Sequence, residues 1–178
     1  MTIGTNYKEL VDECVKQSKK IEYLPYGLIC FQIDINTGKA LQTCRCSNIC
    51  WNSFFLSLVD EEYSREQFFR FKKHMLWEFL GFKAFREYPR GGWFRMDRDT
   101  GPVIFGLGGT ATGFSVAGAV WSKDEQLANS LLKPFELLGV STTKGDQRRY
   151  IAIPIVGDAI MLAMKTACQW RPLWKESK

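Results

Sequence analysis

Acidic and aromatic side chains are concentrated between residues 81 and 106, and they are the groups of this sequence best suited to chemistry. Asp97 and Asp99 stand two positions apart on this stretch, and Glu87 and Tyr88 come shortly before them. Carboxyl groups that differ in burial and in neighbouring charge have different pKa values, so one can donate a proton while another accepts one. We therefore predict that Asp97 and Asp99 are the acid and base of a catalytic set that also includes Glu87 and Tyr88.

The same stretch also has a purely structural interpretation. Asp99 could cap the following turn, Asp97 could be solvated, and Arg86 and Glu87 could pair with neighbours. Loops of this length in compact domains are usually functional or disordered, and the aromatic rings here argue against disorder. We favour a ligand site on that ground. Four further side chains are expected to bind the ligand: Arg45, Arg86, Trp93 and Asp158.

Three cysteines follow one another closely, at Cys44, Cys46 and Cys50. Their C-x-C-x3-C spacing differs from the C-x2-C pairs of structural zinc sites, and the single histidine, His74, belongs to a remote predicted helix. The neighbouring Arg45 keeps open the alternative of a reactive thiol, because a basic group favours the thiolate. We expect no metal ion, no other cofactor and no disulfide.

The composition is that of a globular protein, with 46% apolar and 24% charged residues, and the length of 178 residues predicts a single domain over 1–178. The net charge of +5 is spread along the chain, so no nucleic-acid partner is implied. The N-terminus is charged and helical rather than a secretion signal, which predicts a cytoplasmic protein. The uncharged run 102–121 is long enough for a membrane span, but its small residues favour a buried helix, with membrane association as the alternative.

Helical periodicity dominates the elements that must position these groups. Turn residues at Asn36–Lys39 predict a small β-hairpin within about 28–43. Asp158 is expected either to cap the last helix or to face the ligand. We expect irregular, polar segments at 81–106 and 140–150, and helices at 7–20, 49–59, 64–80, 107–121, 124–138 and 158–169.

Four short elements occur in a recognisable order between Leu24 and Trp170: Arg45–Asn48, Arg86–Pro89 (Arg-Glu-Tyr-Pro), Asp97–Val103 (Asp-x-Asp-Thr-Gly-Pro-Val) and Pro154–Ala159. Their order and spacing resemble a family of bacterial α/α-toroid proteins similar to linalool dehydratase/isomerase. The corresponding family elements are Arg-Gly-Ser-Ser, Arg-Glu-Tyr-Pro, Asp-x-Asp-Ser-Gly-Pro-Val and Pro-x-Gly-Asp-Ala. Here the first element has a cysteine and an asparagine in place of the glycine and the second serine, so this turn departs from the family pattern.

The resemblance implies an all-α fold that corresponds to the C-terminal half of an α/α toroid. A complete toroid closes five or six helical hairpins, whereas this chain supplies about three. The implied function is acid–base chemistry, of the lyase, isomerase or glycoside-processing type, on a small organic or carbohydrate-like ligand. The alternative is a non-catalytic truncated toroid that acts as a ligand-binding or interaction subunit.

The helix expected at 107–121 is apolar on nearly all sides and therefore needs cover from neighbouring elements. Because a half toroid lacks some of its flanking hairpins, we expect a homo-oligomer or a partner chain that supplies the missing half. The surface expected to make this contact combines the first helix with the aromatic face of Trp51, Phe54 and Phe55.

Overall fold

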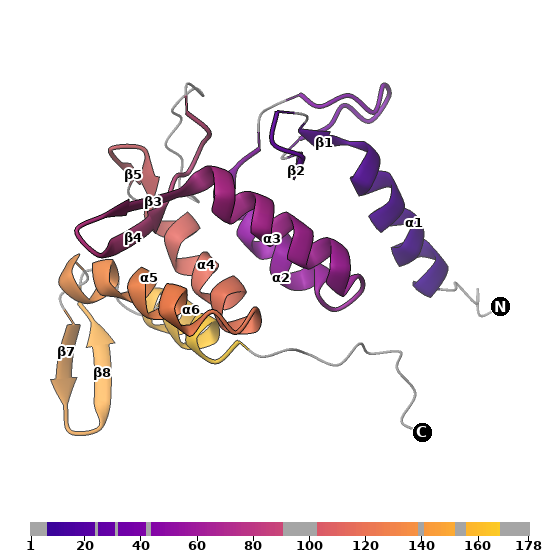
Figure 1. Ribbon diagram of the computed structural model, residues 1–178. Helices are drawn as coiled ribbons and strands as arrows, with labels where there is room; N and C mark the ends of the chain where they lie inside the picture. The colour runs from indigo at the N-terminus through magenta and orange to yellow at the C-terminus, as the bar shows by residue number, and fades with distance from the viewer. Residues whose placement is uncertain are drawn as a thin grey trace.

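The computed structural model describes residues 7–23, 25–30, 32–41, 44–90, 103–138, 141–151 and 156–167, and these are mostly helical (Figure 1). Small antiparallel β-hairpins are interspersed with the helices, in agreement with the predicted class. The helices are α1 (Tyr7–Lys20), α2 (Cys46–Leu56), α3 (Glu61–Met75), α4 (Gly109–Trp121), α5 (Glu125–Leu138) and α6 (Val156–Lys165).

Each sheet of the described chain is a single two-stranded antiparallel pair. Strand β1 pairs with β2 and β3 pairs with β4, while β5 pairs with β6 and β7 pairs with β8. The strands are β1 (Glu22–Tyr23), β2 (Leu28–Ile29), β3 (Leu76–Phe79), β4 (Phe82–Phe85), β5 (Val103–Ile104), β6 (Leu107–Gly108), β7 (Ser141–Lys144) and β8 (Gln147–Tyr150).

Helix α4 lies at the centre of the fold, where α2, α5 and α6 all pack against it. Its small side chains permit this close packing: a Cβ atom on Gly118 would collide with the ring of Phe68 on α3. Ala111, Val116 and Ala119 of α4 are fully buried. The predicted apolar helix is therefore covered by the chain's own elements, so α4 by itself does not require a partner. No described helix combines the length and apolar character needed to cross a bilayer.

Helix α3 ends earlier than the sequence predicts, at Met75 rather than Leu80. It begins properly capped, because the Asp60 carboxylate accepts a hydrogen bond from the backbone N–H of Tyr63 (2.9 Å). The chain after Met75 forms the hairpin β3–β4, whose turn residues Leu80 and Gly81 both have positive φ angles (49° and 77°). Two successive positive φ angles are typical of tight hairpin turns and incompatible with a continuing helix. The prediction of helix over 76–80 is wrong.

Several other boundaries also differ from the predictions. The segment 140–150, predicted to be a polar loop, contains the hairpin β7–β8. Part of the segment predicted to be irregular, 81–106, is the strand β4 and the start of the hairpin β5–β6. Helix α6 begins at Val156, so Asp158 lies in its first turn and is not its N-cap. The hairpin predicted near 28–43 is present around its predicted turn, where Ile33 forms a bridge with Ala40 and the N–H groups of Asp34 and Leu41 donate to the carbonyl oxygens of Lys39 and Gln32 (both 2.9 Å).

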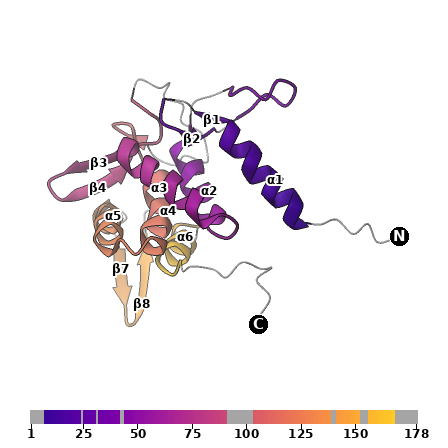
Figure 2. The ribbon, with the colours of Figure 1, turned by 45° about the vertical axis from the view of Figure 1, so that its right-hand side comes forward.

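Helix α1 has the predicted bounds but stands apart from the other helices, and it contains no buried residue (Figures 1 and 2). Its C-terminal end is joined to the body by Lys19, whose Nζ atom donates to the Asp60 carboxylate (2.8 Å) and lies 4.8 Å from the centre of the Tyr63 ring. The rest of α1 projects beyond α3.

Candidate functional site

Glu87 follows strand β4 and connects three parts of the chain through its backbone. Its N–H donates to the carbonyl oxygen of Gly106 (3.1 Å), and its own carbonyl accepts from the N–H of Cys46 (2.9 Å). The preceding residue, Arg86, forms a β-bridge with Leu107. The end of β4 is thereby fixed to the β5–β6 turn on one side and to the first residue of α2 on the other.

The Glu87 carboxylate is held by two side chains from the start of α2. Its Oε1 atom accepts hydrogen bonds from Ser47 Oγ (2.6 Å) and from Arg45 Nε (3.2 Å). The Glu87 side chain is fully buried, and the Arg45 side chain is 7% exposed. The carboxylate also lies at a helix N-terminus, where the helix dipole favours negative charge. We call Arg45, Ser47 and Glu87 the Glu87 cluster.

The second carboxylate oxygen, Glu87 Oε2, is buried and has no hydrogen-bond partner among the described residues. It faces Gly108, where an added Cβ atom would collide with it. Burial raises the pKa of Glu87, while the hydrogen bonds from Ser47 and Arg45 act in the opposite direction. The cluster therefore contains a carboxyl group that takes up a proton more readily than an ordinary glutamate.

The three clustered cysteines, for which a reactive thiol was the alternative prediction, lie in the interior of the protein. Cys44, Cys46 and Cys50 are all buried free thiols, and burial raises the pKa of Cys44 to about 12. Burial also raises the pKa values of Cys46 and Cys50. Cys50 Sγ shares a hydrogen bond with Ser115 Oγ (3.0 Å), which joins α2 to α4. These three groups are protonated at neutral pH, and a protonated thiol is a poor nucleophile. No metal-binding group of histidines, cysteines and carboxylates occurs within the described ranges.

The structure brings some of the predicted site residues together. Glu87 and Arg45 are in direct contact, Arg86 precedes Glu87 on the same strand end, and the half-buried Tyr88 follows it. Asp158 lies in the first turn of α6, which packs against α4 and β8. The remaining predicted residues, Trp93, Asp97 and Asp99, lie outside the described residues.

Two residues of this region were missed by sequence reasoning. Ser47 is not among the predicted site residues, although its hydroxyl group donates to the carboxylate of Glu87, 40 positions later in the chain. Gly108 belongs to a glycine-rich run, and that run was the available signal that something approaches the backbone closely. Thr112 completes the arrangement, since its Oγ1 accepts from the N–H of Phe85 (3.0 Å) and donates to the carbonyl of Gly108 (2.7 Å).

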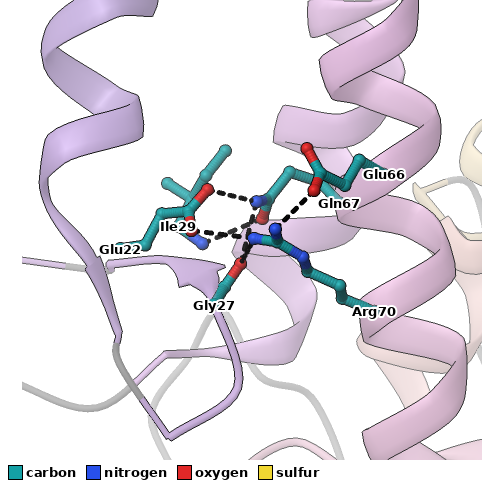
Figure 3. Close-up of polar contacts among 6 residues, drawn as sticks. All are labelled: Glu22, Gly27, Ile29, Glu66, Gln67 and Arg70. Carbon is teal, nitrogen blue, oxygen red and sulfur yellow. Dashed lines mark hydrogen bonds and ion pairs between the residues drawn. The ribbon is translucent and has the colours of Figure 1, made fainter.

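A second polar cluster fixes the β1–β2 hairpin to α3, and its centre is the buried Gln67 (Figure 3). The Gln67 side chain accepts from the N–H of Ile29 (3.0 Å) and donates to the carbonyl of Gly27 (2.9 Å) and to Glu22 Oε1 (2.9 Å). One amide side chain thus satisfies groups on both sides of the hairpin turn.

Arg70 lies one helical turn beyond Gln67 and binds the same hairpin. It donates to Glu22 Oε2 (2.8 Å) and to the carbonyl of Gly27 (2.6 Å), and it also contacts Glu66 (Figure 3). Because a Cβ atom on Gly27 would come within 2.6 Å of the Arg70 guanidinium, this position suits glycine. We call Glu22, Gly27, Gln67 and Arg70 the hairpin clamp.

A surface hollow of about 340 Å3 lies beside the hairpin clamp, between the C-terminal end of α1 and the start of α3. It is open to solvent and strongly polar. None of its residues belongs to the predicted site: it is lined by Lys19, Glu22, Asp60, Glu62, Tyr63 and Glu66.

No protein-family model matches the sequence, and no curated protein is similar enough to indicate a relationship.

Proposed function

We propose that the protein is an acid–base enzyme that acts on a small organic or carbohydrate-like molecule, as the resemblance to the linalool dehydratase/isomerase family implies. The observation that supports this proposal is the incompletely bonded carboxyl group of Glu87. An unsatisfied polar group in the interior costs about 1–3 kcal/mol of stability. Groups that are costly to the fold and have displaced pKa values occur preferentially at functional sites.

Within this proposal Glu87 is a positioning residue. Its side chain is fully buried, so it cannot reach a substrate at the surface. It binds Arg45 and the start of α2, and its backbone binds the turn before β6. Segment 91–102 lies between two parts of the chain that are held in place. Arg90 comes shortly after Glu87, and Val103 pairs with Gly108 in the hairpin whose turn Glu87 binds. The Glu87 cluster would hold the attachment points of the segment that carries the acid and base.

Asp97 and Asp99 would carry out the proton transfers. In a dehydration, one carboxyl group protonates the departing hydroxyl group, which leaves as water, and the other carboxylate removes a proton from the adjacent carbon to form the alkene. In a glycoside hydrolysis, one carboxyl group protonates the leaving oxygen, and the second activates water or attacks the sugar. Arg86 and Tyr88 would orient the ligand or stabilise developing charge.

The helical arrangement is compatible with a toroid-type fold. Consecutive helices pack as neighbours in the pairs α2 with α3 and α4 with α5, and each pair is joined by a short connection. Such helical hairpins are the repeating unit of an α/α toroid, and we propose that this chain represents part of one.

The proposal can be tested with a panel of terpene alcohols and nitrophenyl glycosides incubated with the purified protein, with products followed by gas chromatography and absorbance. We expect turnover of one class by the wild type, and a loss of about 10²- to 10⁴-fold in Asp97→Asn or Asp99→Asn. Asp146→Asn, on the exposed β7–β8 turn, is the matched control and should retain full activity. Equal activity of wild type, Asp97→Asn and Asp99→Asn would refute the assignment.

The alternative is a non-catalytic ligand-binding or interaction subunit, and the position of the surface hollow favours it. This hollow is lined by residues of α1, β1 and α3 and by Asp60, and not by members of the Glu87 cluster. A thermal-shift measurement with the same compounds separates the two functions. Stabilisation of the wild type without any turnover, unaffected by the two aspartate substitutions, would support the alternative.

A further inference from the structure

The surface hollow beside the hairpin clamp has a local excess of negative charge. Of the six described residues that line it, four carry carboxylates and Lys19 is the one cation. The protein as a whole has a net charge of +5, so this excess is confined to the hollow and its surroundings. Glu62 and Glu66 lie four positions apart on α3, where like charges repel one another across the helix surface. A cation bound beside both would reduce this repulsion.

Some of these carboxylates are already paired, and others retain free acceptor atoms. Both oxygens of Glu22 accept hydrogen bonds within the hairpin clamp, and one oxygen of Glu66 accepts from Arg70 (Figure 3). Glu62 is exposed and makes neither a hydrogen bond nor an ion pair within the described chain. Glu62 and the second oxygen of Glu66 are therefore available to an added cation.

Tyr63 contributes a buried polar group to the same hollow. It is only 2% exposed, and its hydroxyl group has no hydrogen-bond partner among the described residues. Burial raises the pKa of this phenol, and the nearby carboxylates of Glu22 and Glu66 raise it further, so the hydroxyl group lies on the acidic side of the hollow and stays protonated. A buried polar group without a partner costs stability, and a ligand that supplies the partner recovers that cost.

An ammonium group of the chain itself already occupies part of the hollow. Lys19 Nζ donates to Asp60 Oδ2 (2.8 Å) and lies 4.8 Å from the centre of the Tyr63 ring. The Asp60 hydrogen bond raises the pKa of Lys19, and the Glu62 and Glu66 carboxylates act in the same direction. A carboxylate together with the face of an aromatic ring is a typical binding site for an alkylammonium ion. Because the Lys19 side chain is 48% exposed, this contact is weak and can be exchanged.

We propose that the hollow binds a linear aliphatic polyamine. One ammonium group would take the place of Lys19 beside Asp60 and the Tyr63 ring, and the next would lie beside Glu62 and Glu66. Asp60 and Glu66 are separated by about 9 Å along the axis of α3, which a linear polyamine spans and a compact ion does not. The described residues offer no cluster suited to a metal ion, so an organic cation fits the hollow better. The inference does not rest on the proposed acid–base function.

Titration of the isotope-labelled protein with spermidine, followed by amide NMR spectra, tests the site. At about 100 mM NaCl, which screens weak long-range attraction, we expect a dissociation constant below about 1 mM. The amide signals of Lys19, Glu62 and Tyr63 should shift most. Butylamine, which has a single charge, and hexaamminecobalt(III), which is trivalent but compact, should each bind at least about fivefold more weakly. No binding at about 10 mM spermidine, or equally tight binding of the cobalt complex, would overturn the proposal.

Charge-matched variants separate the hollow from a general effect of charge. Glu62→Gln/Glu66→Gln should weaken spermidine binding about tenfold, because two charge-assisted hydrogen bonds are lost. Glu61→Gln/Glu125→Gln removes the same charge from two exposed carboxylates that do not line the hollow, and it should bind as the wild type does. Circular dichroism verifies that both variants are folded. Equal weakening in the two variants would refute the assignment.

Two further substitutions test the place of the first ammonium group. Lys19→Met removes the competing ammonium group and should tighten spermidine binding about two- to fivefold, the equivalent of an exposed ion pair. Tyr63→Phe keeps the ring but removes the unpartnered hydroxyl group, and it should weaken binding about two- to tenfold without lowering the melting temperature. Weaker binding by Lys19→Met would show that the ligand does not replace Lys19, and the proposed mode of binding would be wrong.

Discussion

The hairpin clamp and the Glu87 cluster both pair a carboxylate with an arginine, but they treat the carboxylate differently. In the clamp, each oxygen of Glu22 accepts a hydrogen bond, one from Gln67 and one from Arg70. The Glu22 side chain retains 18% of its exposure and that of Arg70 retains 30%. In the cluster, Glu87 has no exposure and only one of its oxygens is bonded among the described residues.

The hairpin clamp therefore stabilises the fold, whereas the buried Glu87 carboxyl group lowers its stability. The charges of the clamp are partly hydrated and fully paired, so their main effect is to fix the β1–β2 hairpin on α3. The Glu87 carboxyl group is removed from water with incomplete compensation, and its raised pKa is the consequence. Four substitutions test this comparison, in order of decreasing expected effect.

Removal of the Arg45 charge should have the largest effect. Arg45→Met leaves the Glu87 carboxylate buried without its cation, and breaking one side of a buried pair typically costs about 3–5 kcal/mol. Chemical denaturation monitored by circular dichroism measures the free energy of unfolding. The double variant Arg45→Met/Glu87→Gln should recover part of the loss, since no charge then remains buried. A double variant as unstable as Arg45→Met alone would show that packing, not charge, is responsible.

Gly108→Ala should come next, with a loss of about 3 kcal/mol, because its methyl group collides with a carboxylate that Ser47 and Arg45 hold in place. Gly113→Ala is the matched control: it lies on α4, and its added Cβ would only touch the end of the Phe135 ring at 3.4 Å. Gly113→Ala should leave the free energy of unfolding unchanged or increase it, because alanine has a higher helix propensity than glycine. Equal losses in the two variants would contradict the predicted collision.

Disruption of the clamp should cost less. Gln67→Leu keeps the apolar volume but leaves the N–H of Ile29 without its partner, and a loss of about 1–2 kcal/mol is expected. Hydrogen exchange of the Ile29 amide should accelerate, while the amide of Cys46, bonded to Glu87, should remain protected. Simultaneous acceleration of both amides would show that the two regions unfold as one unit.

The smallest effect concerns the dependence of stability on pH. A carboxyl group with a raised pKa binds its proton more tightly in the folded state, so its contribution to stability falls as pH rises above the unfolded value of 4.5. Glu87→Gln removes this titration. The free energy of unfolding of Glu87→Gln, minus that of the wild type, should therefore increase between about pH 4 and pH 7. A difference that stays constant or falls would mean that the pKa of Glu87 is not raised.

Much of the helical framework could be predicted from the sequence, because the residue composition changes clearly at the ends of α1, α4 and α5. The hairpin β3–β4 was missed because Leu76–Phe79 continues the apolar and aromatic character of the preceding helix, and a local pattern does not distinguish the two. The hairpin β7–β8 was missed for the opposite reason: its exposed strands lack the alternation of apolar residues that normally indicates a strand.

The candidate site was predicted only in part. Local sequence identified Arg86, Glu87 and Tyr88 as a group and placed Arg45 among the expected ligand-binding residues. The bond from Ser47 to Glu87 and the approach of Gly108 depend on how distant elements pack, and no local pattern contains that information.

The long separation between Glu87 and its partners also has a consequence for the order of folding. Arg45 and Ser47 lie 42 and 40 positions before Glu87 in the chain, so closing these contacts requires a large loop to be ordered first. Contacts of such long range tend to form slowly, after local helices and hairpins. Until that moment the carboxylate remains hydrated and behaves as an ordinary glutamate. The Glu87 carboxylate is therefore desolvated late in folding. Acidic conditions protonate this group, so they should accelerate its burial more than they accelerate formation of the helices.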